Sequence, residues 1–399
     1  RYTISALLMI QDMHSKGLTK WTPTDAPLLG GFAQQYNRTQ RLLKKQFTQA
    51  KTRLRKYAPV IVKSGGLTPI HLDTDKEGLI TISNGRLLIK FDNRVLYGYL
   101  VYTIKTMNNY RYNHKQEHWT VPFNAFNLEV LFGLGFKWKV SDGVYEFYKS
   151  ETIQKRKIEI KNITMPLREY QKEGISYAEA KNGKALLAYD CGLGKTPMSI
   201  SYVASKELYP AIVVCPANLK LNWQKEILRW DSTVSENDIE LLSGLSPWPI
   251  NKQSKYVIVN YDIIYEWKDY ISNISPESLI VDEVQYIKTS KRRVKVQNPR
   301  PGQARTQEVP VKRTAGVFAI GKKIPTKIGL SGTPIENRVI EFYNVLNLLR
   351  PDLFSSVWKF GFRYADLKRN KAGMGWDWSG RSNTSELNRV LTKLVMIRK

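Results

Sequence analysis

The chain has 399 residues, of which 42% are hydrophobic and 11% aromatic, so it is long enough for two or three globular domains and too apolar to be disordered. Its 62 Lys and Arg residues outnumber 35 Asp and Glu residues, and the formal net charge of +27 favours a polyanionic partner such as nucleic acid over a basic protein without one. Its two cysteines, four histidines and lack of a 20-residue apolar run argue against a disulfide framework, a zinc site and a membrane span, so we expect an intracellular protein.

Residues 1–60 are predicted to form a basic helical segment. Apolar side chains recur at helical spacing at Leu43, Phe47, Ala50 and Leu54, while Lys and Arg cover the other faces. These cations are either a solvated surface or a contact to DNA, and the pattern leaves both open.

Residues 61–160 are predicted to be a small α+β module. Its Asn84-Gly85 pair is typical of a β-hairpin turn. Trp119 and its aromatic neighbours are either core residues or platforms on which bases stack. The expected elements are strands at 78–82 and 87–91, a helix at 94–107, a strand at 118–122, a helix at 124–132 and a strand at 144–148.

From residue 161 to residue 399 the pattern alternates between apolar strands and helices, which predicts a parallel sheet covered by helices on both faces. The fold class is therefore α/β. The expected strands are 185–188, 211–215, 256–262, 279–281 and 328–330, and one helix is expected at 197–208.

A glycine-rich turn follows the first of these strands. Gly192 and Gly194 let the backbone approach an anion, Lys195 can reach the β- and γ-phosphates, and the Thr196 hydroxyl can ligate Mg²⁺. Tyr189 stands where the strict phosphate-loop pattern has glycine. The turn alone leaves an ordinary strand–turn–helix open.

A second pair of groups makes the phosphate site more specific. Asp282 and Glu283 end an apolar strand, where Asp282 can hold Mg²⁺ and Glu283 can orient and deprotonate the attacking water. The loop, the carboxylates and a later Ser331-Gly332-Thr333-Pro334 segment together predict a site for ATP and Mg²⁺.

This set of motifs resembles the first RecA-like lobe of superfamily 2 helicases, and within them the Swi/Snf-type ATPases. The matching segments are 167–171, 192–196, 215–223, 282–283 and 330–334. The resemblance implies that Gln171 reads adenine with Arg168 nearby, that Ser331 and Thr333 couple the nucleotide state to DNA, and that Lys220, Asn222 and Tyr261 line the DNA track.

The closing segments Phe360–Asp366, Gly375–Gly380 and Met396–Lys399 look like those of the HARP-domain annealing helicases. Residues 79–150 similarly resemble a divergent HARP module, with Trp119 at its centre. That resemblance implies that this module, and Trp119 within it, binds DNA structures.

Three features depart from the family pattern. Tyr189 replaces an acidic residue, and Gln285 replaces a histidine, which puts the coupling of hydrolysis to DNA in question. Residues 291–313 are a basic insertion, expected as a mobile loop that either is merely solvated or contacts DNA. The chain begins at Arg1 and stops at Lys399, where a second lobe would follow, so we expect part of a longer product that hydrolyses ATP weakly alone.

The sequence therefore predicts an ATP-driven motor, active as a monomer, that rewinds or remodels double-stranded or branched DNA, with a single-strand-binding protein as a possible partner and no membrane. Two alternatives stay open. One is a remodeller that removes proteins from DNA, and the other is a DNA-binding scaffold with a vestigial nucleotide site.

Overall fold

The computed structural model of the protein describes residues 25–39, 45–46, 49–50, 77–91, 97–134, 137–153, 155–295, 306–333, 338–369 and 375–399. The chain forms two compact units, one of residues 1–150 with 356–390 and one of 151–355 with 391–399. Helix α2 (Ala26–Thr39) belongs to the predicted helical segment. Of the four residues that gave this segment its helical spacing, Leu43, Phe47 and Leu54 lie outside the described residues.

The first unit contains a five-stranded sheet in the order β3-β4-β2-β1-β5. Asn84 and Gly85 both have positive φ, at 50° and 69°, which is the geometry of a tight hairpin turn and confirms the predicted hairpin. The elements are β1 (Glu77–Ser83), β2 (Arg86–Phe91), α5 (Tyr97–Thr106), β3 (Arg111–Asn113), β4 (His118–Pro122), α6 (Ala125–Gly133), β5 (Lys137–Val140) and α7 (Asp142–Thr152).

The strand predicted at 144–148 is wrong, because these residues lie in helix α7. Val144 is buried, and Phe147 and Tyr148 pack against the same core. Their spacing of three and four residues places them on one helical face, whereas the strand prediction followed the β-forming residue types Val, Tyr and Phe. The missing strand is instead β5, which pairs in parallel with β1.

The later part of the first unit contains α14 (Val357–Tyr364), β14 (Lys368–Arg369), β15 (Trp376–Asp377) and the first residues of α15 (Thr384–Leu394), whose last residues from Leu391 belong to the second unit. A buried ion pair joins its two helices. The Arg363 guanidinium donates to both carboxylate oxygens of Glu386, at 2.7 and 2.6 Å. This bidentate pair ties α14 to α15 inside the unit.

The second unit is a seven-stranded, all-parallel sheet in the order β16-β6-β13-β10-β7-β9-β8, which confirms the predicted α/β fold and is the architecture of a RecA-like lobe. Each predicted strand of this lobe is present, and β16 and β8 are added at the two edges. The strands are β6 (Lys184–Ala188), β7 (Ala211–Cys215), β8 (Ile239–Leu241), β9 (Tyr256–Asn260), β10 (Ser278–Val281), β13 (Thr326–Leu330) and β16 (Met396–Arg398).

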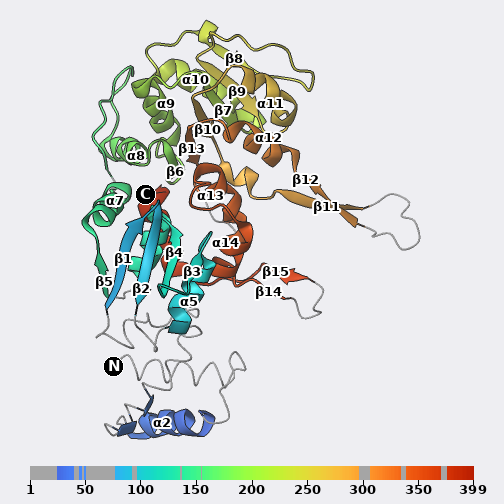
Figure 1. The fold of residues 1–399 in the computed structure, drawn as a ribbon. Helices are drawn as coiled ribbons and strands as arrows, with labels where there is room; N and C mark the ends of the chain where they lie inside the picture. The colour runs from blue at the N-terminus through green and yellow to red at the C-terminus, as the bar shows by residue number, and fades with distance from the viewer. Residues whose placement is uncertain are drawn as a thin grey trace. The chain divides into compact units, whose positions relative to one another are not determined.

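Helices lie on both sides of this sheet (Figure 1). Helices α8, α9 and α10 cover one face of the sheet. Helices α11, α12 and α13 lie on the other face. Both faces of the central strands are buried, as expected of a parallel sheet. The helices are α8 (Glu169–Ala180), α9 (Lys195–Lys206), α10 (Lys220–Trp230), α11 (Ile264–Asn273), α12 (Lys312–Gly321) and α13 (Tyr343–Leu349). No helix in the described part of the chain is long and apolar enough to cross a bilayer.

The basic insertion is not a loop at its two ends. Residues Lys291–Lys295 form β11 and Thr306–Pro310 form β12, which pair as an antiparallel hairpin that leads directly into α12. This hairpin extends away from the sheet (Figure 1). Lys291–Lys295 contains four cations and a single β-branched residue, Val294, so the sequence alone does not favour a strand here.

Candidate functional site: the phosphate loop and its neighbours

The glycine-rich turn joins β6 to the N-terminus of α9. Gly192 and Gly194 have φ of 82° and 76°, a left-handed conformation that side chains other than glycine rarely adopt. The Lys195 ammonium folds back over the turn and donates to the carbonyls of Tyr189, at 2.8 Å, and Asp190, at 3.2 Å. The turn thus places glycine backbone, a lysine and the positive end of a twelve-residue helix at one spot, which suits a phosphate chain.

Gln171 lies directly over this turn. Its side-chain oxygen accepts a hydrogen bond from the Arg168 backbone N–H at 2.9 Å, and its nitrogen donates to the Leu193 carbonyl at 3.4 Å. A methyl group on Gly194 would come within 2.3 Å of the Gln171 nitrogen. The structure therefore brings Gln171 and the backbone of Arg168 to the phosphate loop, while the Arg168 side chain is exposed.

Tyr189, the departure from the motif, belongs to the core beneath the loop. Its ring is fully buried, its hydroxyl donates to the Tyr170 carbonyl at 3.1 Å, and burial raises the pKa of Tyr189 to about 12. At this position only the backbone carbonyl contacts the loop lysine, by accepting a hydrogen bond from Lys195. The Tyr189 side chain therefore packs in the core and makes its hydroxyl hydrogen bond there.

Asp282 follows β10 and is largely buried. Its Oδ2 accepts a hydrogen bond from the Trp223 indole N–H at 2.9 Å, and its Oδ1 accepts from the Glu283 backbone N–H at 3.0 Å. Burial, together with the neighbouring Glu283 charge, raises the pKa of Asp282 above its ordinary value, although the Trp223 hydrogen bond and the positive charge of Lys195 oppose this rise. These two partners favour the ionised form, and each oxygen keeps a lone pair for a metal ion.

The oxygen donors near the loop fit Mg²⁺ better than a metal ion that is coordinated by protein side chains alone. Within the described residues, no group of three His, Cys, Asp or Glu side chains could enclose an ion. Mg²⁺ commonly uses one or two protein oxygens and completes its shell with water and substrate phosphates. Asp282 and the Thr196 hydroxyl, at the start of α9, are the side chains that would hold it.

Glu283 is connected to the Ser331 segment through Gln285. Glu283 has a positive φ of 47°, and its Oε2 accepts a hydrogen bond from the Gln285 amide nitrogen at 2.6 Å. The Gln285 oxygen accepts from the Ser331 hydroxyl at 2.8 Å, and the Ser331 oxygen accepts from the Thr333 backbone N–H at 3.1 Å. The glutamine that replaces the expected histidine therefore bridges the two motifs.

The Ser331 segment also touches the phosphate loop. A methyl group on Gly332 would lie 3.1 Å from the Cys191 sulfur and 3.9 Å from the Lys195 ammonium. The loop, the carboxylates and the Ser331-Gly332-Thr333 segment thus meet at the carboxyl end of β6, β10 and β13. Pro334 lies outside the described residues.

The residues predicted to contact DNA differ in how exposed their side chains are. Asn222 and Thr333 are exposed, and the Lys220 ammonium donates to the Leu242 carbonyl at 2.8 Å. Tyr261 is only 2% exposed and donates its hydroxyl hydrogen bond to the Asp282 carbonyl. Trp119, in the first unit, is 7% exposed and packs on Tyr112 with ring centroids 4.7 Å apart. The DNA contacts of these residues stay predictions.

Sequence reasoning missed Trp223 and Tyr261 as partners of Asp282. Trp223 and Ile227 are the buried positions of α10, four residues apart on the face that meets the sheet. That spacing identifies Trp223 as a core residue but does not reveal which polar atom its N–H reaches.

Comparisons with known proteins match the same part of the chain. Residues 167–297 match the model of the SNF2-related domain. The chain is 30% identical over 237 residues to the SWI/SNF-related matrix-associated actin-dependent regulator of chromatin subfamily A-like protein 1 of Bos taurus, an alignment that covers 58% of this chain and 22% of the relative. It is 27% identical over 237 residues to the DNA annealing helicase and endonuclease ZRANB3 of Homo sapiens, covering 58% of this chain and 20% of the relative.

The chain spans about a fifth of the length of the curated relatives it matches. The matched residues include the phosphate loop, the Asp282-Glu283 pair and Gln285, which the structure places together. Residues 167–297 therefore match the SNF2-related domain, and over 58% of its length the chain is similar to relatives named as a SWI/SNF-related regulator and as a DNA annealing helicase.

Proposed function

We propose that this protein is a DNA-dependent ATPase that moves on double-stranded or branched DNA inside the cell and rewinds or remodels it. The observation that carries the proposal is the contact of three sequence-distant motifs at one edge of the sheet. Lys195 lies beside Gly332 and near Asp282, and Gln285 links Glu283 to Ser331. The names of the relatives support DNA as the partner.

In this proposal each side chain has one task. Lys195 and the loop backbone bind the β- and γ-phosphates, and Gln171 holds the adenine. Asp282 and Thr196 hold Mg²⁺, which supplies charge neutralisation at the transferred phosphoryl group. Glu283 orients the attacking water and accepts its proton.

The Gln285–Ser331 link supports a route from Glu283 to the segment that ends in the exposed Thr333. A change in Glu283 would alter its hydrogen bond to Gln285 and thereby the position of Ser331. The proposed coupling between hydrolysis and DNA therefore needs no histidine at position 285.

ATP hydrolysis by the full-length protein, with and without forked DNA, tests the proposal. We expect stimulation by DNA, and a loss of at least about a hundredfold in Lys195→Ala. Lys206→Ala is the matched control, since Lys206 lies at the other end of α9 in an exposed ion pair with Glu179. A rate that neither DNA nor Lys195→Ala changes would favour a scaffold with a vestigial nucleotide site.

A second assay separates rewinding from protein removal. A DNA bubble held open by single-strand-binding protein should close in the presence of ATP and stay open with Lys195→Ala. If the bubble stays open while hydrolysis is normal, the protein-removing remodeller is the better description.

A further inference from the structure

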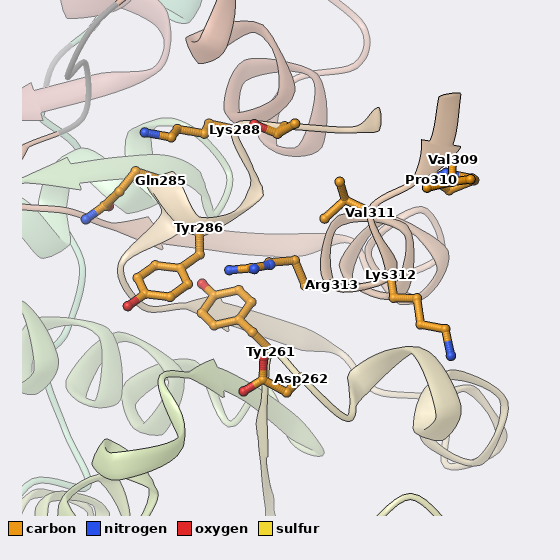
Figure 2. Close-up of a pocket in the computed structure, with 11 residues that line it drawn as sticks. Tyr261, Asp262, Gln285, Tyr286, Lys288, Val309, Pro310, Val311, Lys312 and Arg313 are labelled. Atoms are coloured by element: carbon orange, nitrogen blue, oxygen red, sulfur yellow. The ribbon is translucent and has the colours of Figure 1, made fainter. Parts of the chain in front are cut away.

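A pocket lies beside the Glu283–Gln285–Ser331 link, in the second unit. It has a volume of about 810 Å³ and lies between the ends of β9 and β10 and the base of the β11–β12 hairpin. Figure 2 shows its side chains, with Tyr261 and Tyr286 on one side and Val309 and Val311 on the other. We call it the tyrosine pocket. Its size is that of a site for a single small molecule or one nucleotide, not for a duplex.

Two stacked tyrosine rings form the aromatic side of the pocket. The rings of Tyr261 and Tyr286 stack with centroids 5.0 Å apart and an interplanar angle of 14°. Tyr261 is 2% exposed and donates a hydroxyl hydrogen bond to the Asp282 carbonyl, whereas Tyr286 is 43% exposed. The pocket thus presents an exposed ring supported by a buried one, opposite an aliphatic wall, and flat aromatic groups suit such a slot.

The pocket also carries an available positive charge. The Arg313 guanidinium lies 5.9 Å from the centre of the Tyr286 ring, reaches toward both tyrosines in Figure 2, and has no carboxylate partner among the described residues. Lys288 and Lys312, which also line the pocket, already contact Glu341 and Glu266 at 3.7 and 2.7 Å. The one carboxylate in the lining is Asp262. The lining is therefore net positive, with Arg313 free to bind an anion.

We propose that the tyrosine pocket binds one unpaired nucleotide of the DNA, whose base contacts Tyr286 and the Val309–Val311 wall and whose phosphate pairs with Arg313. The inference rests on the proposed function and adds to it a substrate class, unpaired DNA. In a duplex the bases are stacked inside, so only an unpaired nucleotide offers a free ring together with its phosphate.

The position of the pocket gives this binding a consequence for hydrolysis. Gln285 lines the pocket and is also the residue that links Glu283 to Ser331. A nucleotide held against Tyr286 is therefore one residue away from this link. Unpaired DNA would then be sensed next to the proposed catalytic carboxylate.

Equilibrium binding in the absence of ATP tests the pocket separately from hydrolysis. The 399-residue chain is titrated with a single-stranded oligonucleotide that contains 2-aminopurine, and with a fully paired duplex of the same sequence. Base stacking on Tyr286 should quench the 2-aminopurine fluorescence. Tyr286→Leu and Arg313→Gln should each weaken single-strand binding by about tenfold while changing duplex binding by less than about twofold.

Matched controls keep the result specific. Tyr286→Phe retains the aromatic ring and should therefore retain the quenching of 2-aminopurine. A loss of quenching in this variant would show that stacking on the ring is not the cause. Lys322→Gln removes an exposed charge at the far end of α12, and Tyr270→Leu removes a half-buried tyrosine on α11, and both should bind as the unaltered chain does.

The proposal is overturned if Tyr286→Leu and Arg313→Gln bind the single strand normally, if they lose single strand and duplex equally, or if a polyglutamate peptide competes as well as the oligonucleotide does. If these binding differences are seen but DNA does not stimulate hydrolysis, the pocket proposal stands and the proposed function fails. If DNA stimulates hydrolysis but the binding differences are absent, the proposed function stands and the pocket proposal fails.

Discussion

The hydroxyl of Ser331 donates a hydrogen bond to the side-chain oxygen of Gln285 at 2.8 Å, although 46 residues separate the two in the sequence. The nitrogen of the same amide donates to Glu283 at 2.6 Å. An amide has a donor and an acceptor on one planar group, so a glutamine can satisfy a carboxylate and a hydroxyl at once.

This link predicts that Gln285→Leu uncouples hydrolysis from DNA. The variant should bind ATP normally but lose DNA stimulation by about tenfold or more, because a hydrogen bond to a charged group contributes about 1.5–3 kcal/mol. Gln285→His, which keeps a side chain able to donate and accept, should retain more of the stimulation. The ratio of rates with and without forked DNA measures the effect, and an unchanged ratio in Gln285→Leu would contradict it.

The two loop glycines should respond differently to alanine. Both have positive φ, so Gly192→Ala and Gly194→Ala should each lose about 1–2 kcal/mol of unfolding free energy. A methyl group at Gly192 meets nothing within 4 Å, whereas one at Gly194 collides with Gln171. We therefore expect only Gly194→Ala to weaken the preference for ATP over GTP, measured by competition binding. Equal preferences in the two variants would argue against adenine recognition by Gln171.

Trp223 should matter through its N–H group. Trp223→Phe keeps most of the buried ring but leaves the Asp282 carboxylate without one of its two hydrogen bonds, which should cost about 1–3 kcal/mol of stability and weaken Mg²⁺-dependent nucleotide binding. The control lies on the same helix, since the Trp230 indole N–H bonds to Glu226. Trp230→Phe should leave Mg²⁺-dependent binding unchanged. Calorimetric titration with and without Mg²⁺ distinguishes the two.

The first unit should depend on the Arg363–Glu386 pair. Their side chains are 5% and 11% exposed, so Arg363→Ala leaves a buried carboxylate without its cation and should lower the unfolding free energy by about 3–5 kcal/mol. Lys149–Glu146 is an exposed ion pair in the same unit, and Lys149→Ala should change stability by about 1 kcal/mol at most. Urea denaturation followed by circular dichroism measures both. Similar losses would show that burial does not decide the strength of these pairs.

The strand assignments of the second unit followed from the sequence because several central strands hold a continuous apolar run, such as Ile212–Cys215 in β7 and Leu279–Val281 in β10. The phosphate loop was equally readable, since its positive-φ positions are glycines. Segments whose secondary structure depends on tertiary partners could not be assigned correctly from the sequence. The residues 144–148 fit a strand or a helix until the core beside Val144 is known, and the edge strand β16 has only three residues.

Some residue roles in the site could be predicted from the sequence, and others depend on contacts that only the fold makes. Lys195, Asp282 and Glu283 are recognisable because their chemistry and spacing recur in one motif each. The bridge through Gln285 depends on the meeting of two segments, and position 285 alone suggested a weakened link rather than a formed one. Trp223 likewise became part of the site only through the fold.

The strand that leads into the phosphate loop, β6, has neighbours that arrive late during synthesis. It lies between β13 and β16, whose first residues follow its own by 142 and 212 positions. While the chain leaves the ribosome, β6 therefore stays without its neighbouring strands until residues 326–330 have been synthesised. Such an exposed apolar strand invites wrong pairing and chaperone binding, and a chain truncated before Met396 would lack the strand that pairs with one edge of β6.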